Sequence, residues 1–156
     1  RILNQERLKN FMVEIGGEVY AQGEKPGGDL WKIGIDAPSL ASLPGQNIQA
    51  ILSLKDVAVA TSGDYRNYFE KNGKRYSHTI DPRTGYPVDH TLASVTVIEK
   101  TAVRADALAT AMMVMGPEDS LMLAEEYNIP VYILVKEADG FKVQYSKAFA
   151  QYLSGD

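Results

Sequence analysis

Hydrophobic and polar positions alternate along this chain in short runs, which predicts a sheet built from many short strands. Eight runs have the length and pattern of strands, at residues 11–15, 18–22, 30–35, 48–54, 57–61, 92–99, 131–136 and 141–145. The breaker-rich segment 25–29 predicts that strands 18–22 and 30–35 pair as an antiparallel hairpin with one buried face. The strand at 92–99 is expected to alternate in the same way.

Two helices are predicted in the second half of the chain. Residues 105–115 have a helical pattern that is followed by Gly116 and Pro117, the residues that commonly end a helix. Residues 118–127 predict a second helix with acidic residues in its first turn. Residues 6–12 resemble the end of a third helix. Because strands and helices each cluster along the chain, we expect an α+β domain, a largely antiparallel sheet with helices packed on one side.

The composition narrows the possible functions. The 156 residues suffice for one domain, and their net charge of −4 provides no basic footprint for nucleic acid. An anionic ligand would therefore need local groups or a metal ion. The absence of cysteine excludes disulfides, thiolate metal sites and a cysteine nucleophile. No apolar run approaches the roughly 20 residues of a membrane-spanning helix.

The densest group of polar residues lies at residues 77–90, hereafter the central loop. It contains both histidines of the chain, and its two X-Pro steps hold Asp81 and Tyr86 in extended conformations. Gly85 supplies a position where a positive φ costs little. Asp81 is expected either to pair with Arg83 or to form an Asx turn. A rigid polar loop of this kind predicts the floor of a functional site.

Several residues could carry chemistry, and each also has an ordinary structural interpretation. Asp106 and Thr110 lie one helical turn apart and offer hard oxygen ligands for Mg²⁺, or Asp106 caps the helix while Thr110 bonds back to the i−4 carbonyl. His78 could act as a general base or be a bystander, and nothing in the sequence favours a function for His90. Glu18 follows two glycines, and its carboxylate either points into a cleft or is simply a solvent-facing side chain at the start of a strand.

Four stretches in the same order along the chain resemble the ApbE family, the FAD:protein FMN transferases: MVEIGGEVYAQG, VAVATSGDYRNYF, SHTIDPRTGYPV and ADALATAMMVMG. The resemblance is clearest from residue 11 to about residue 116. It implies an ApbE-like (T-fold-like) fold, of which residues 1–156 are the C-terminal portion of a single catalytic domain without its N-terminal FAD-binding segments. Tyr20 stands where the family often has arginine.

The resemblance also implies an activity and a set of site residues. Family members move the FMN portion of FAD to a threonine or serine hydroxyl of a target flavoprotein, with Mg²⁺, and release AMP. By residue-for-residue match, Asp106, Ala109 and Thr110 would bind the metal, with Ala109 using its carbonyl, and His78 would be the catalytic base. The FAD-binding positions would be Ile80, Asp81, Gly17, Glu18 and Thr61. The resemblance favours the metal interpretation of Asp106 and the base interpretation of His78.

Two other functions are compatible with the same residues. One is an FAD pyrophosphatase, in which water replaces the protein hydroxyl and the products are FMN and AMP. The other is a flavin-binding module without catalysis, which would not need His78. The expected partners are FAD and an acceptor flavoprotein, with no nucleic acid. The expected location is the bacterial periplasm, with a lipid anchor in a segment that this chain does not contain.

Overall fold

A six-stranded antiparallel sheet forms the centre of the molecule. The computed structural model describes residues 2–37, 46–63, 68–71 and 74–154. Within these ranges the sheet has the order β1-β2-β5-β10-β11-β12, and each neighbouring pair is antiparallel. Its strands are β1 Phe11–Ile15, β2 Glu18–Gln22, β5 Val57–Gly63, β10 Leu92–Glu99, β11 Val131–Glu137 and β12 Gly140–Tyr145. The predicted α+β architecture is confirmed.

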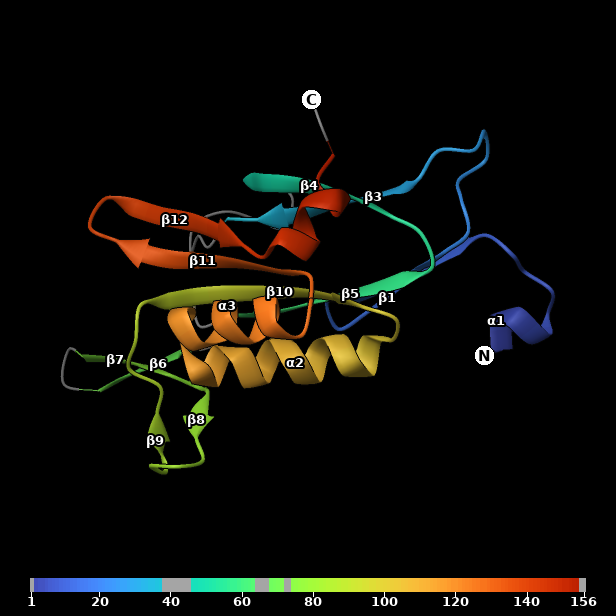
Figure 1. The fold of residues 1–156 in the computed structure, drawn as a ribbon. Helices are drawn as coiled ribbons and strands as arrows, with labels where there is room; N and C mark the ends of the chain where they lie inside the picture. Colours follow the sequence, from blue (N-terminus) through green and yellow to red (C-terminus); the bar gives the residue numbers. More distant parts are fainter. Residues whose placement is uncertain (1, 38–45, 64–67, 72–73, 155–156) are drawn as a thin grey trace.

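Two consecutive helices, α2 Ala102–Met115 and α3 Pro117–Glu126, cover one face of this sheet (Figure 1). The Thr101 side chain caps α2 by accepting a hydrogen bond from the Arg104 N–H. Gly116 ends α2 at a φ of 89°, a conformation that favours glycine, and Pro117 starts α3. The apolar side chains of α2 pack against Leu92, Val95 and Val97 of β10. Helices on one side of the sheet were predicted correctly.

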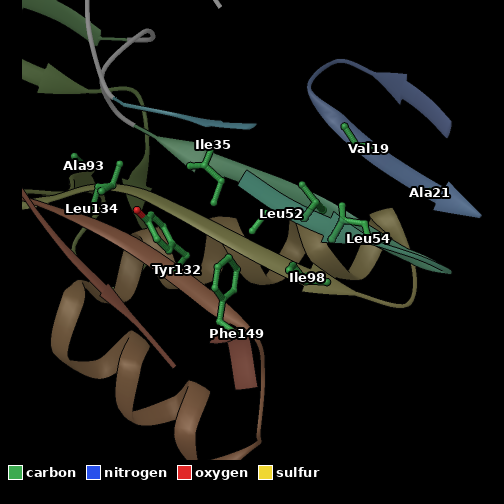
Figure 2. Close-up of a cluster of buried hydrophobic side chains, with 11 residues drawn as sticks. Val19, Ala21, Ile35, Leu52, Leu54, Ala93, Ile98, Tyr132, Leu134 and Phe149 are labelled. Atoms are coloured by element: carbon green, nitrogen blue, oxygen red, sulfur yellow. The ribbon is translucent and has the colours of Figure 1, made fainter. Parts of the chain in front are cut away.

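A two-stranded sheet covers part of the other face. It consists of β3 Trp31–Asp36 and β4 Ile48–Leu54, and the 3₁₀ helix η1 Lys147–Tyr152 packs beside it. Figure 2 shows the apolar cluster that these elements form, with Phe149 of η1 beside Tyr132 and Ile35, Leu52 and Leu54 on the β3 and β4 strands.

The strand β10 is buried on both faces because of this arrangement. The sequence predicted alternation with one solvent-facing side, and that prediction is wrong, since every residue from Leu92 to Ile98 is buried. A strand covered on both faces needs no exposed positions. The polar residues Ser94 and Thr96 therefore lie inside, and the Thr96 hydroxyl is hydrogen bonded to the Thr61 hydroxyl on β5 at 2.8 Å.

Three other expectations need correction. The strand at 18–22 does not pair with the strand at 30–35, because its two edges are occupied by β1 and β5, and β3 pairs with β4. The N-terminal helix is α1 Ile2–Gln5 and not residues 6–12, where Arg7 adopts a left-handed φ of 61° and β1 begins at Phe11. The helix predicted at 105–115 begins three residues earlier, at Ala102.

The central loop projects from the body of the molecule near the C-terminal end of α2 (Figure 1). It follows the hairpin of β6 Tyr68–Lys71 and β7 Lys74–Ser77, and it contains two short paired strands, β8 Ile80–Asp81 and β9 Tyr86–Pro87. The structure therefore gives this loop a hairpin of its own.

None of the helices in the described ranges is long and apolar enough to cross a membrane.

Candidate functional site

A cavity of about 470 Å³ gathers most of the predicted site residues. It lies where the β1–β2 turn, the end of β3, the end of β5, the start of the central loop and the helix α2 meet. Six predicted residues line it, namely Gly17, Glu18, Thr61, His78, Asp106 and Thr110. Residues that are 93 positions apart in the chain, Gly17 and Thr110, thus share one cavity wall.

The β1–β2 turn brings backbone and a carboxylate to the cavity. Gly16 and Gly17 have φ values of 71° and 107°, so both central residues of this two-residue hairpin have positive φ. A type I′ turn needs that combination, which glycine adopts without strain. The Glu18 carboxylate folds back over Gly16, where a Cβ atom would lie 3.0 Å from its Oε2. A side chain at Gly16 would therefore displace that carboxylate.

The helix α2 presents Asp106 and Thr110 to the cavity from exposed positions one turn apart. The Thr110 hydroxyl is hydrogen bonded to the Ser62 hydroxyl at 3.1 Å, which ties α2 to the end of β5. Because Thr101 caps α2, Asp106 is the fifth residue of the helix and not its cap. The capping interpretation of Asp106 is wrong, since the helix starts earlier than the sequence pattern indicated.

Ala109 lies between these two residues but points away from the cavity. Its methyl group is fully buried in the core between α2 and the sheet. Any contribution to a metal would come from its carbonyl oxygen, which as an interior helix carbonyl accepts one intrahelical bond and keeps a second lone pair. The position of Ala109 is compatible with the expected role, which stays a prediction.

The polar side chains at the cavity offer hard oxygen donors, the kind of ligand that Mg²⁺ prefers. No three His, Cys, Asp or Glu side chains gather as a metal cluster within the part of the chain that the structure describes. The cavity lining combines the carboxylates of Glu18, Asp36 and Asp106 with the hydroxyls of Thr110 and Ser62. Of these, Asp106 and Thr110 are the predicted metal ligands. Oxygen donors of this kind are compatible with Mg²⁺, which keeps several waters and takes further oxygens from a phosphate ligand, and the metal itself stays a prediction.

The hydroxyl of Thr61 has a structural partner. Its bond to Thr96 joins two directly opposite residues of β5 and β10, and Thr61 also lines the cavity. The Thr61 side chain is thereby fixed at the cavity wall. Its expected role in binding the cofactor stays a prediction.

Two other predicted residues, Ile80 and Asp81, lie on the hairpin of the central loop and not in the cavity. The Ile80 side chain is about half exposed. The Asp81 Oδ1 accepts the Arg83 backbone N–H at 2.8 Å, and both carboxylate oxygens accept the guanidinium, with Oδ2 2.9 Å from Nη2. Both alternatives for Asp81, the Asx turn and the ion pair, therefore occur together. These contacts with Arg83 lower the pKa of the Asp81 carboxyl below its ordinary value.

The two histidines are at opposite ends of the central loop. His78 follows β7 directly and lines the cavity from an exposed position. Its expected role as a base stays a prediction. His90 lies about 12 residues further on and lines a separate hollow of about 510 Å³ beneath the hairpin, together with Asp81, Arg83 and Met115.

Three polar residues of the cavity, Asp36, Ser62 and Thr79, were not among the predicted site residues. The pairing of β3 with β4 shifts register between Ile35 and Asp36, and such a bulge redirects the side chain beside it. Asp36 consequently lines the cavity at the end of its strand. A polar residue that directly follows an apolar strand was the available signal for Asp36, and the position of Ser62 beside Thr61 was the signal for that hydroxyl.

A larger apolar hollow of about 780 Å³ adjoins the polar cavity. It is lined by α1, β1, β2 and the start of α2, and it shares Glu18 and Asp106 with the cavity. Ile15 and Val103 on its walls are among the most exposed apolar side chains described, at 74% and 80%. The polar groups of the site thus lie at the border of an apolar surface.

Comparison with known proteins finds one family throughout. The model of the ApbE family matches residues 1–133. The FAD:protein FMN transferase of Vibrio cholerae is 47% identical over 152 residues, which are 97% of this chain and 45% of that protein. The chain therefore spans about half the length of the curated relatives that it matches.

Solved structures agree with the sequence matches. The apo form of the Pseudomonas stutzeri flavinyl transferase ApbE superposes with a TM-score of 0.81 at 46% identity, over 99% of this chain and 48% of the other. The flavin transferase ApbE from Vibrio cholerae gives a TM-score of 0.83 at 44% identity, over 97% and 47%. The overall fold of this chain is therefore that of about half of these proteins.

Proposed function

Because the chain belongs to the ApbE family, we propose that its full-length protein transfers the FMN portion of FAD to a threonine or serine hydroxyl of an acceptor flavoprotein. AMP is the other product. The observation that carries this proposal is the shared cavity, which groups a histidine with a carboxylate and a hydroxyl on α2. Relatives that are 35% to 47% identical to this chain carry the name FAD:protein FMN transferase, which supports the same activity.

Asp106 and Thr110 would hold Mg²⁺ in this cavity, with the Ala109 carbonyl beside them. The bound ion would neutralise charge on the pyrophosphate, which the acidic chain does not do by its overall field. The bond between Thr110 and Ser62 keeps this face of α2 fixed against β5. Positioning of that kind accounts for much of the catalysis in phosphoryl-type transfer.

His78 takes the proton of the acceptor hydroxyl. The hydroxyl oxygen forms a bond to the phosphorus of the FMN moiety, the bond between that phosphorus and the bridging oxygen breaks, and AMP leaves with the electron pair. The proton on His78 then passes to solvent water. The exposed position of His78 at the cavity allows a protein hydroxyl to reach it.

Four of the remaining predicted residues, Gly17, Glu18, Thr61 and Ile80, would contact the nucleotide. The positive-φ turn at Gly17 leaves backbone N–H groups without bulky neighbours, and Glu18 and Thr61 offer oxygen acceptors for sugar hydroxyls. Ile80 would use its backbone. Asp81 would act by holding the loop rigid through its bonds to Arg83.

Mass spectrometry of an acceptor protein tests the proposal. The full-length protein is incubated with FAD, Mg²⁺ and an acceptor with an exposed threonine, and the acceptor mass and released AMP are measured. We expect a mass gain of one FMN moiety that disappears in EDTA. Asp106→Asn keeps the size of the side chain and removes its charge, so transfer should fall by at least about 10²-fold. Glu126→Gln, an exposed carboxylate at the end of α3, is the matched control and should transfer normally.

The histidine variant separates the alternative functions. A general base contributes about 10² to 10⁴ in rate, so His78→Ala should lose transfer by that factor while still binding FAD. AMP and free FMN without an acceptor mass gain would indicate a pyrophosphatase. Bound flavin without any AMP would indicate a binding module and overturn the transferase. Full activity in EDTA would overturn the roles of Asp106 and Thr110.

We also propose that the full-length protein is a lipid-anchored protein of the bacterial periplasm, as the family resemblance implies. Cell fractionation with mass spectrometry of the N-terminal peptide checks this. Recovery of unmodified protein from the cytoplasm would contradict it.

A further inference from the structure

His90 uses both ring nitrogens to connect the end of the central loop to α2. Its Nε2–H donates to the backbone carbonyl oxygen of Met113 at 2.9 Å. Its Nδ1 accepts the backbone N–H of Leu92 at 3.3 Å, where β10 begins. Because a carbonyl only accepts and an N–H only donates, these two partners select the neutral tautomer with its proton on Nε2.

The partner on α2 is a group that helices leave unsatisfied. The last four carbonyls of a helix have no intrahelical donor, and Met113 is two residues from the end of α2. The neighbouring Met112 carbonyl accepts the Gly116 N–H at 3.2 Å and the buried Ser120 hydroxyl at 2.8 Å. His90 thus donates a hydrogen bond to the Met113 carbonyl, as Gly116 and Ser120 do to the Met112 carbonyl.

Close packing fixes the ring in this place. A Cβ atom on Gly116 would lie 3.4 Å from the His90 Cδ2, so the imidazole lies against the glycine that ends α2. The His90 side chain is half-buried there. A larger residue at Gly116 would push against the ring and would also strain the backbone at its φ of 89°.

The contact bears on the site because one end of the central loop lines a cavity with α2 residues and the other end is hydrogen bonded to α2. His78, at the start of the loop, lines the cavity with Asp106 and Thr110. The Met113 carbonyl that holds the other end is three residues beyond Thr110, about 4.5 Å along the helix axis. Any sliding of the loop against α2 would change the relation between His78 and the Asp106–Thr110 pair.

The loop is stiff in itself, so its attachment decides where it lies. Hydrogen bonds within it join Val88 N–H to the Thr79 carbonyl at 3.0 Å and Gly85 N–H to the Asp81 carbonyl at 2.8 Å. Its strands β8 and β9 pair with each other and not with the main sheet. These bonds connect loop residues to one another, whereas the His90 bond connects the loop to α2.

We propose that His90 is a positioning residue that sets the placement of the central loop against α2, and thereby aligns His78 with the Asp106–Thr110 pair. The expected effect on turnover rests on the flavin transfer proposed above, whereas the contact between His90 and α2 does not depend on that activity. His90 lines the separate hollow beside the hairpin and not the cavity that contains His78, so it acts through the loop.

Two isosteric replacements separate the two bonds of the ring. In His90→Gln the amide nitrogen takes the place of Nε2 and can still donate to the Met113 carbonyl. In His90→Asn the amide oxygen takes the place of Nδ1 and can still accept from Leu92, but the side chain is too short to reach α2. The neighbouring Thr91→Ala, which changes an exposed side chain, is the control.

Steady-state kinetics of FMN transfer by the full-length protein is the main readout, with Tm measured in parallel. For His90→Asn we expect kcat to fall by about 10- to 100-fold, because a displacement of about 1 Å can cost that much, while the KM for FAD stays within about threefold. His90→Gln should keep kcat within about threefold of wild type. Thr91→Ala should match wild type, and all four proteins should unfold at similar temperatures.

Amide hydrogen exchange gives a readout that does not depend on activity. The amide of the buried Gly116, against which the His90 ring lies, should exchange faster in His90→Asn than in His90→Gln or Thr91→Ala, because release of the loop end uncovers the end of α2. Wild-type kcat and unchanged exchange in His90→Asn would overturn the proposal. A loss of kcat in proportion to a fall in Tm, equal in both variants, would also overturn it in favour of a purely structural role. If wild type transfers no FMN, the transferase proposal fails, and the exchange result alone decides whether His90 anchors the loop.

Discussion

At the scale of single residues, Asp81 shows how one carboxylate stiffens the central loop. Its oxygens accept the Arg83 backbone N–H and the Arg83 guanidinium, so the Asx turn and the ion pair reinforce each other. The sequence had left these as alternatives. They are compatible because a carboxylate has about four acceptor positions.

The pKa of Asp81 should depend on Arg83. In Arg83→Gln the charge-assisted bond is lost, so we expect the Asp81 pKa to rise toward its ordinary value of about 3.9. A depressed folded-state pKa means that the ionised carboxyl stabilises the fold above the unfolded pKa, and that this contribution is lost as pH falls through the folded pKa. In Arg83→Gln, the loss of this stabilisation as pH falls should begin at a higher pH than in wild type.

An NMR titration of the Asp81 carboxyl carbon measures this shift. Lys142→Gln removes an exposed positive charge from β12 and should leave the titration of Asp81 unchanged. An Asp81 pKa that is the same in wild type and Arg83→Gln would show that the guanidinium does not hold the carboxyl.

At the scale of elements, the start of α2 decides what Asp106 can do. The apolar pattern placed the start near Ala105, where Asp106 could serve as a cap. The Thr101 cap moves the start one turn earlier, which places Asp106 inside the helix and directs it to the cavity. Thr101 was a weak local signal for this earlier start, because threonine is a common N-cap residue but lies four residues before Ala105, where the apolar pattern begins.

Removing this cap should weaken α2. The Thr101 hydroxyl accepts the Arg104 N–H at a long 3.4 Å, so Thr101→Ala should lower the free energy of unfolding by about 0.5–1 kcal/mol, the low end for caps. Thr101→Ser keeps the hydroxyl and should stay close to wild type. Urea unfolding measures both. Equal stability of the alanine and serine variants would show that this bond does not contribute.

At the scale of the whole molecule, Tyr132 lies where the layers meet. It belongs to the main sheet, packs against Phe149 of η1 with ring centroids 5.4 Å apart, and is 3% exposed. Burial, and to a smaller degree the nearby Tyr145 phenol, raises the pKa of Tyr132 to about 12. The Tyr132 phenol in the folded protein therefore keeps its proton above about pH 10, near which a tyrosine in the unfolded chain loses it.

This difference predicts how the fold responds to alkali. With a raised folded-state pKa, the contribution of Tyr132 is fully present below about pH 10 and is lost as pH rises toward about 12. Tyr132→Phe should flatten the decline in unfolding free energy between about pH 10 and about pH 12, measured by urea unfolding. Tyr127→Phe, which changes an exposed tyrosine, should retain the wild-type slope. The same slope in Tyr132→Phe would contradict the assignment.

The pattern along the chain was sufficient for the local elements. The alternation at residues 11–15 and 18–22, the Gly16–Gly17 turn and the Gly116–Pro117 break each involve interactions within a few residues, so their physical cause is contained in short segments. These local patterns did not join Glu18, Thr61, His78 and Asp106 into one site; the resemblance to the ApbE family did.

Tertiary structure decided which elements meet. The pairing of β3 with β4 depends on which strand edges remain open, and the double-sided burial of β10 depends on what covers the sheet. The same long-range packing brings Asp36 and Ser62 into the cavity and places His90 on the Met113 carbonyl. Local periodicity does not encode these contacts, because each joins segments that are far apart in the chain and is selected by the packing of the whole.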